Sequence, residues 1–69
     1  MRNDIPTEFK QDYSNGYEHS LQDIQRIGWK RSRDKYNRDY PNLHKFNTMG
    51  AYYYAEGRID ALYDKELDA

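Results

Sequence analysis

Residues 13–21 read YSNGYEHSL and residues 54–62 read YAEGRIDAL, so a short pattern returns after 41 positions. Both stretches begin with tyrosine, carry glycine at the fourth position and a small residue at the eighth, and end with leucine. On a helix, the glycine and the small residue four positions later share one face, which leaves a flat patch where another backbone can approach closely. A glycine inside a helix costs about 1 kcal/mol relative to alanine, so Gly16 and Gly57 need a reason. The pattern predicts that two helices cross at these glycines; the alternative is a partner's helix lying on the same patch.

The first pattern lies within a longer stripe of apolar residues that recur at steps of three or four: Phe9, Tyr13, Tyr17, Leu21 and Ile24. This spacing is typical of an amphipathic helix. We expect the helix to begin near Thr7, after a polar lead over residues 1–6, because Pro6 is tolerated in a first turn. The residues expected outside the apolar stripe are Lys10, Asp12, Glu18, Gln22 and Asp23.

Gly28 divides the helical segment that we predict over about residues 7–39. The residues that continue the helical spacing beyond it are Trp29, Arg33, Tyr36 and Tyr40. Gly28 is therefore either the C-cap of a first helix or a tolerated interruption, and both one long helix and two abutting helices fit the pattern.

A connecting loop is predicted over residues 40–47. Pro41 ends the preceding helix, because the residue before a proline is pushed away from helical dihedral angles. Leu43 and Phe46 are expected to pin the loop to the core.

A last helix is predicted over about residues 48–67, with Asn47 or Thr48 as its N-cap. Its buried stripe is expected to contain Met49, Tyr52, Ile59, Leu62 and Leu67. Its acidic residues are Glu56, Asp60, Asp64, Glu66 and Asp68.

The 69 residues are therefore expected to form one all-α domain over residues 1–69, as a small helical hairpin or a three-helix arrangement. Alternating β-branched strands and Gly-rich turns are not visible. The absence of cysteine excludes disulfide frameworks and thiolate zinc sites. No apolar run approaches the roughly 18 residues of a membrane helix, and the start MRNDIPTEF lacks the apolar stretch of a signal peptide, so we expect a cytoplasmic protein without a membrane partner. A core this thin also leaves a homodimer open.

The glycine pattern resembles that of small two-helix proteins of the ribosome modulation factor type, and that of short phage-encoded proteins, which carry a Gly-aromatic-x-x-small motif in each helix around a central proline. The matching residues are Gly16, Tyr17, Ser20, Tyr40, Pro41, Gly57 and Ala61. Arg58 stands where the second aromatic residue of that motif is found. The resemblance implies a helical hairpin, and a protein that binds the ribosome and silences it.

The formal net charge of -1 conceals an uneven distribution. The basic residues between positions 26 and 38 are Arg26, Lys30, Arg31, Arg33, Lys35 and Arg38. Asp34 is the one acid among them, and three aromatic residues, Trp29, Tyr36 and Tyr40, are interleaved with them. This composition is typical of a surface that binds phosphates, bases or an acidic partner. The alternative is that this basic helix packs beside the acidic last helix of the same chain.

Tyr52, Tyr53 and Tyr54 cannot all face one core, because adjacent helical positions differ by about 100°. At least one of them is expected to be exposed. Tyrosine is enriched at interfaces, so the run favours a recognition surface or a dimer interface. In the structural alternative, Tyr52 is a core residue and the other two lie flat across the hairpin.

Catalysis, metals and cofactors are not indicated. His19 and Asp23 share a helical face next to Glu18, but no third ligand accompanies them at a metal-binding spacing, and His44 lies in the predicted loop. A phosphate-cradling glycine loop and a nucleophile motif are both missing from the sequence. We expect no enzyme, no metal and no cofactor.

The sequence therefore favours a small binding protein. The candidate binding residues are Trp29, Lys30, Arg31, Arg33, Tyr36, Arg38, Tyr53 and Arg58. The leading hypothesis is a phage or mobile-element regulator that stoichiometrically binds and inhibits a host or defence complex of protein or nucleoprotein. The alternatives are a ribosome- or RNA-binding modulator that uses residues 26–40, and an oligomeric sponge for a small nucleotide ligand.

Overall fold

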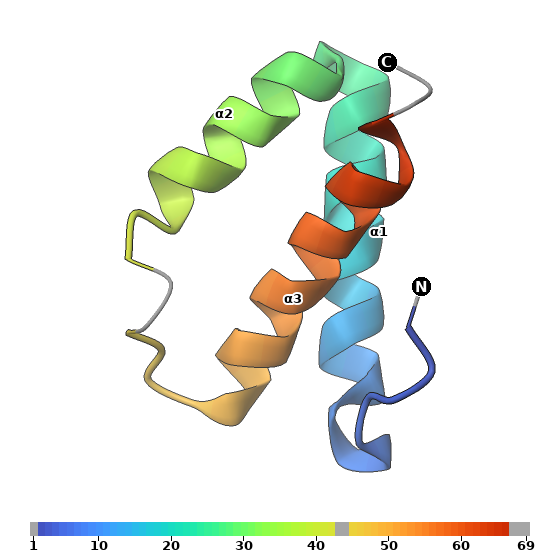
Figure 1. Ribbon diagram of the computed structural model, residues 1–69, viewed down its shortest axis with the longest axis vertical. Helices are drawn as coiled ribbons and strands as arrows, with labels where there is room; N and C mark the ends of the chain where they lie inside the picture. Colours follow the sequence, from blue (N-terminus) through green and yellow to red (C-terminus); the bar gives the residue numbers. More distant parts are fainter. Residues whose placement is uncertain (1, 43–44, 67–69) are drawn as a thin grey trace.

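The computed structural model of the chain describes residues 2–42 and 45–66, and these residues form an all-α fold. A single 3-10 turn, η1 (Thr7–Phe9), leads into α1 (Lys10–Ile27), which is followed by α2 (Trp29–Asp39) and α3 (Met49–Asp64). Figure 1 shows α3 lying across α1, while α2 folds back from the end of α1 and leans away from both. The three-helix alternative is therefore the correct one, and no strand occurs in the part of the chain that the structure describes.

The predicted crossing of two helices at the glycines is confirmed. A Cβ atom on Gly16 would collide with the carbonyl oxygen of Tyr54, and one on Gly57 would collide with the carbonyl oxygen of Tyr13. Each glycine thus lets the backbone of the opposite helix lie directly against its own. The patch is covered by the chain itself, so it is not free to receive a partner's helix.

Gly28 separates two abutting helices. Its φ of 88° is a left-handed value that ends α1, and its N–H still donates to the carbonyl of Ile24 at 2.9 Å. The same residue is the N-cap of α2, where its carbonyl accepts from the backbone N–H of Ser32 at 3.1 Å and from the Ser32 hydroxyl at 2.7 Å. A positive φ costs a glycine little, and this makes the sharp change of direction possible.

The ends of the remaining helices follow the predicted signals. α2 ends at Asp39, two residues before Pro41. Thr48 is the N-cap of α3, because its hydroxyl accepts from the N–H of Ala51 at 3.0 Å. Phe46 is partly buried and packs on two residues outside the buried core, with its ring centroid 5.9 Å from that of Tyr40 and 5.7 Å from that of Tyr52. The predicted contacts of Leu43 and Leu67, and the loop position of His44, lie outside the described residues.

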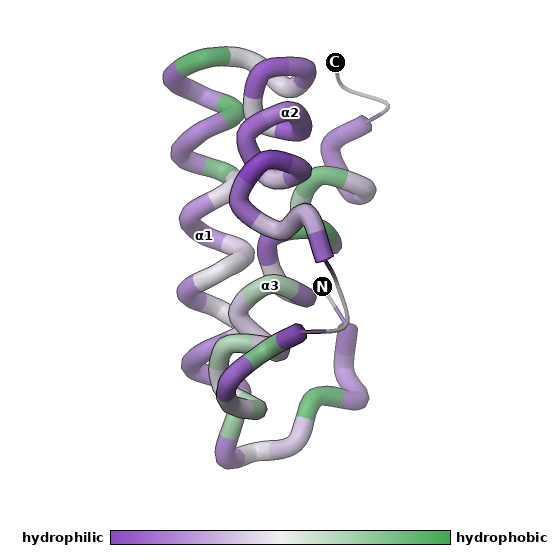
Figure 2. The backbone as a smooth tube through the Cα atoms, turned by 90° about the vertical axis from the view of Figure 1, so that its left-hand side faces the viewer, coloured by the Kyte–Doolittle hydropathy of each residue, from purple (hydrophilic) through white to green (hydrophobic). Residues whose placement is uncertain are grey.

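The buried residues differ from the predicted apolar stripes. The buried apolar side chains are Ile5, Tyr13, Tyr36, Ala55, Ala61 and Leu62. The assignment of Met49 and Tyr52 to the core is wrong, since they are 54% and 36% exposed. The glycine crossing turns the small-residue face of α3 toward α1, and this rotates Met49 and Tyr52 out of the interface. Figure 2 shows how little hydrophobic surface α2 can add, as nearly all of it is hydrophilic.

The placement of Asp23 outside the buried face was also wrong. This carboxylate is 2% exposed, in line with Gly16 and Ser20 on the buried side of α1. Its burial is compensated by basic side chains from all three helices, which are described below.

Candidate functional site

The eight candidate binding residues are dispersed by the fold. Tyr36 and Arg58, at 4% and 3% exposure, are buried, so the expectation that they form a binding surface is wrong for both. The partly buried members of the set are Trp29, Arg33 and Tyr53. The exposed members are Lys30, Arg31 and Arg38.

Arg58 is buried because it links α3 to both other helices. Its guanidinium carbon lies 5.6 Å from the ring centroid of Tyr36 and 5.3 Å from that of Tyr40, so the cation lies against two aromatic faces. One terminal nitrogen donates to Asp39 at the end of α2 at 3.1 Å, and the other lies 3.8 Å from Asp23 in α1. Arg58 thus has a structural role within the fold, because it connects α3 to α1 and α2.

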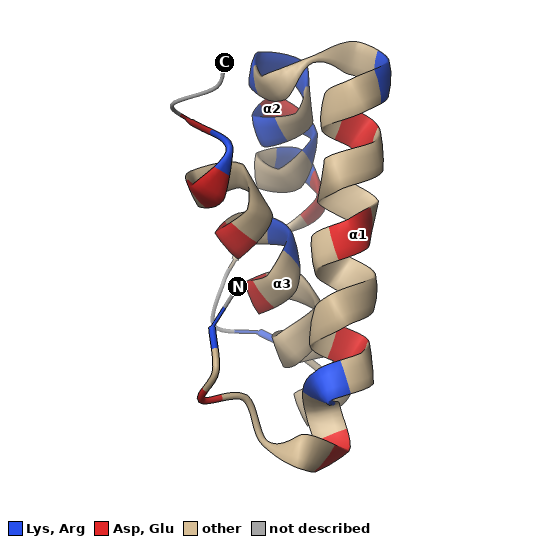
Figure 3. Cartoon of the chain, turned by 90° about the vertical axis from the view of Figure 1, so that its right-hand side faces the viewer, with Lys and Arg blue, Asp and Glu red and all other residues tan. Residues whose placement is uncertain are grey.

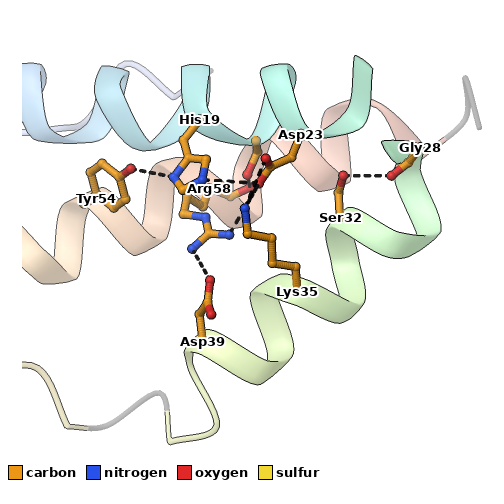
Figure 4. A network of polar contacts seen from close by, with 9 residues as sticks. His19, Asp23, Gly28, Ser32, Lys35, Asp39, Tyr54 and Arg58 are labelled. Atoms are coloured by element: carbon orange, nitrogen blue, oxygen red, sulfur yellow. Dashed lines mark hydrogen bonds and ion pairs between the residues drawn. The ribbon is translucent and has the colours of Figure 1, made fainter. Parts of the chain in front are cut away.

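Asp23 is the centre of this polar cluster, which Figure 4 shows from close by. The Lys35 ammonium donates to both of its carboxylate oxygens, at 3.1 and 3.2 Å, and His19 Nε2 lies 3.3 Å away. Nearby, the Ser20 hydroxyl donates to the carbonyl of Arg58 at 2.8 Å. A buried carboxylate is tolerated only where cations and donors surround it, as here.

His19 completes the cluster. Its Nδ1 lies 2.6 Å from the Tyr54 hydroxyl. Because Nε2 faces a carboxylate, it carries the proton of the neutral ring, and Nδ1 accepts from Tyr54. Burial, and secondarily the charge of Arg58, lower the pKa of His19 below its ordinary 6.5. Both ring nitrogens are engaged within the protein, and the described residues contain no group of three ligands that could hold a metal ion.

The partly buried candidates make specific contacts within the chain. The Trp29 indole N–H donates to the carbonyl of Leu62 at 2.7 Å. Arg33 lies over the indole ring, 5.3 Å from its centroid, and contacts Asp34 at 3.3 Å. The Tyr53 ring stacks on Phe9 at a centroid distance of 5.0 Å. Each of these three side chains is therefore already held by contacts within the chain and is not fully available to a partner.

Of the three consecutive tyrosines, Tyr52 is the exposed one. The alternative that made it a core residue is therefore wrong, while Tyr53 and Tyr54 are half-buried. Six rings follow one another at centroid distances of 5.0 to 5.9 Å, in the order Tyr36, Tyr40, Phe46, Tyr52, Tyr53 and Phe9. This run connects α2 to η1, and because only Tyr36 of the six is buried, most of these aromatic rings pack on one another at the edge of the core.

The α2 outer face, which we define as Lys30, Arg31, Asp34 and Arg38, is a basic surface. All four residues are exposed, and the three cations make no ion pair or hydrogen bond with any described residue. Figure 3 shows several basic residues close together on α2, with acidic residues on all three helices. This face is the part of the predicted binding surface that the fold leaves available.

The alternative that the basic helix packs against the acids of the last helix is not what the structure shows. Glu56 and Asp60 of α3 pair instead with Arg2, at 3.0 and 3.1 Å. Where α2 and α3 exchange an ion pair, the polarity is reversed, since α3 supplies Arg58 and α2 supplies Asp39. The basic residues of the α2 outer face are therefore not neutralised by α3.

One residue of the surface was missed from the sequence. Tyr63 is 65% exposed, more than any other large hydrophobic side chain among the described residues. It directly follows the buried Leu62, at the edge of the stripe that the helical spacing predicts to be buried. The sequence therefore contains no signal that marks Tyr63 as more exposed than its neighbours.

Comparison with known proteins adds no further constraint: no protein-family model, curated protein or solved structure matches this chain. Within the described residues, no helix combines the length and the apolar character needed to cross a membrane.

Proposed function

We propose that this chain is a small non-enzymatic binding protein that holds an acidic surface of a protein partner through the α2 outer face. In this proposal it is a stoichiometric regulator, of the kind encoded by phages and mobile elements, that occupies a host or defence complex. The observation that carries the proposal is that Lys30, Arg31 and Arg38 are exposed and unpaired within the described chain.

These three cations contrast with the other basic residues of the same helix. Lys35 pairs with Asp23, and Arg33 contacts Asp34. Arg31 and Arg38 are seven positions apart, which is about 10 Å along a helix at 1.5 Å per residue. Unpaired cations over such a distance attract an oppositely charged surface and orient it before contact.

A protein partner is favoured over a nucleic acid by two features of this helix. Asp34 lies one turn from Lys30 and one turn from Arg38, with 60% of its side chain exposed. Three cations with one acid among them suit a protein surface that is acidic overall but also carries a basic group, whereas a phosphate backbone is uniformly anionic. Of the aromatic side chains in the same stretch, Tyr36 is buried, and Trp29 and Tyr40 are partly buried with an arginine of the chain against each ring, so they offer little free ring surface on which bases could stack.

The test is capture from a candidate host lysate by the full chain immobilised on a support. The variant K30A/R31A/R38A removes the three cations of the α2 outer face. The matched control K10A/R26A/K45A removes three exposed cations outside α2. Circular dichroism and thermal melting establish that both variants retain the fold.

We expect the wild-type chain and the control to retain the same protein complex at a defined stoichiometry, before and after nuclease treatment, and the α2 variant to lose it. Equal capture by the α2 variant would overturn the assignment of this face. Capture that disappears with nuclease, with a log affinity that falls steeply with log salt, would replace the protein partner by RNA or the ribosome.

A further inference from the structure

A groove runs between α2 and α3 on a side of α2 different from the α2 outer face. It consists of two adjoining hollows, of about 350 and 190 Å³, which share Ile59 and Tyr63. Trp29 and Leu62 line the smaller hollow, and Tyr36 and Phe46 line the larger one. A groove that combines aromatic and charged side chains with an exposed tyrosine at its edge is typical of a protein interface.

The two walls of this groove carry opposite charges at the smaller hollow. The α2 wall contributes Arg33 to the smaller hollow, and the segment that ends α3 contributes Glu66 to the same hollow. Further along α3, Glu56 and Asp60 line the larger hollow, where both pair with Arg2. The smaller hollow therefore has a cation, Arg33, on its α2 wall and a carboxylate, Glu66, on its α3 wall, whereas the acids of the larger hollow are paired with Arg2.

Arg33 has unused hydrogen-bonding capacity at this place. Its Nε is buried and has no hydrogen-bond partner, and its guanidinium contacts only the exposed Asp34 and the Trp29 ring. The side chain as a whole is 43% exposed, so an acceptor placed at the smaller hollow could pair with its terminal nitrogens, while the buried Nε stays out of reach.

We propose that the groove is the contact surface of a homodimer, and that its occupant is a second copy of this chain. A two-fold axis along the groove places the α2 wall of each copy over the α3 wall of the other. Arg33 and Glu66 line the same hollow, so they lie at the same level along the axis, and each meets its counterpart in the second copy. Such an interface is isologous and occurs twice by symmetry.

A second copy fits the groove better than a partner of uniform charge. At the smaller hollow, an acidic partner would be attracted by Arg33 but repelled by Glu66, and a basic partner would be attracted by Glu66 but repelled by Arg33. In the two-fold arrangement, Arg33 of each copy faces Glu66 of the other, so both charges have an opposite partner. It also covers Tyr63 with the α2 wall of the other copy, which adds apolar burial to a chain whose own core is small.

The dimer goes beyond the proposed function and does not depend on it. Lys30, Arg31 and Arg38 lie on the other side of α2 and do not line the groove. They would remain exposed in the dimer, which would present two such faces.

The test is sedimentation equilibrium of the full chain over a concentration series up to about 1 mM, which detects a dimer with a Kd as weak as about 1 mM. Trp29 is the only tryptophan, so a concentration-dependent change in its emission reports on the groove itself. The variants are Tyr63→Glu, Arg33→Glu and Glu66→Arg, with Met49→Glu as a control at an exposed apolar residue outside the groove. Circular dichroism identifies any variant that is not folded.

We expect the wild type and Met49→Glu to dimerise, and each of the three groove variants to dimerise at least ten-fold more weakly. An equimolar mixture of Arg33→Glu and Glu66→Arg should form a heterodimer, because each altered residue then faces an opposite charge. The double variant R33E/E66R should regain the homodimer for the same reason. A strict monomer for the wild type would overturn the proposal, as would a dimer that the three groove substitutions leave unchanged or one that charge exchange does not restore.

Discussion

Gly16 of α1 lies so close to the backbone of Tyr54 in α3 that an added Cβ would come within 2.8 Å of the Tyr54 carbonyl carbon. Gly57 repeats the relationship from the other helix, where a Cβ would lie 2.8 Å from the backbone nitrogen of Tyr17. Because the obstacles are backbone atoms, they cannot move aside by a change of side-chain rotamer. The two glycines therefore determine how closely α1 and α3 can approach.

Gly16→Ala and Gly57→Ala are each expected to destabilise the fold by about 2 kcal/mol or more, because the overpacking at the crossing exceeds the roughly 1 kcal/mol that alanine adds to helix propensity. Urea denaturation followed by circular dichroism measures the change. Gly50→Ala is the control, because its Cβ would meet only the Asp12 side chain, at 3.2 Å, and this side chain can move. An unchanged midpoint for both crossing variants would show that α1 and α3 can move apart enough to accept the added Cβ without loss of stability.

Arg58→Met is expected to lower the free energy of unfolding by about 3 kcal/mol, since it leaves the buried Asp23 with fewer cations and Asp39 without the donor at 3.1 Å. Arg58→Lys should lose part of this stability, because an ammonium cannot lie flat between the rings of Tyr36 and Tyr40. Chemical denaturation of both variants provides the measurement.

The comparison variant for the buried arginine is Arg31→Met, which removes an exposed cation that has no partner in the described chain. Its stability should stay within about 0.5 kcal/mol of the wild type. If Arg58→Met were as stable as the wild type, the buried ion pairs would contribute nothing to stability.

The stability of the fold should decrease as the pH falls below about 6.5. The pKa of His19 is lowered in the folded chain, chiefly by burial, so the unfolded chain binds the proton first. This histidine's contribution is present above the unfolded pKa of 6.5 and is lost as the pH falls through the folded pKa. Urea midpoints at pH 7.5, 6.5 and 5.5 in a His44→Gln background, where His19 is the remaining histidine, measure the slope. The further substitution His19→Gln should flatten it, and an equal slope in both proteins would contradict the assignment.

Alkaline conditions should destabilise the fold through Tyr36. Burial raises the pKa of its hydroxyl from 10.0 to about 12, so the unfolded chain loses this proton first. Stability from this group is complete below pH 10 and is lost as the pH rises toward 12. Tyr36→Phe keeps the ring beside Arg58 and removes the ionisation, so its unfolding free energy should depend less steeply on pH over this range. Measurements at pH 8, where the hydroxyl is neutral in both states, provide the baseline, and parallel slopes would refute the prediction.

Local signals in the sequence predicted the helices and their ends. Gly28 and Pro41 lie at the two breaks, and Thr48 caps α3, because each acts through the backbone of its immediate neighbours. The repeated glycine pattern also predicted the crossing of α1 and α3, since a glycine inside a helix is unfavourable unless another backbone needs the space.

The candidate site was predicted less well. Lys30, Arg31 and Arg38 are exposed as expected, but Tyr36 and Arg58 belong to the interior. The spacing of apolar residues on α3 favoured Met49 and Tyr52 for the core, whereas the actual interface uses Ala55 and Ala61, whose small side chains carry little hydrophobic signal.

The sequence by itself therefore determined the all-α class, the positions of the breaks and the crossing point, because these depend on dihedral preferences and on missing side chains. Only the tertiary structure decided which polar residues are buried and which aromatic residues remain exposed. Asp23 can be buried because His19, Lys35 and Arg58 surround its carboxylate. The farthest of these in sequence, Arg58, is 35 residues away from Asp23. Local spacing places His19 one turn from Asp23, but Lys35 reaches it only because α2 folds back from α1, and Arg58 only because the glycines bring α1 and α3 together.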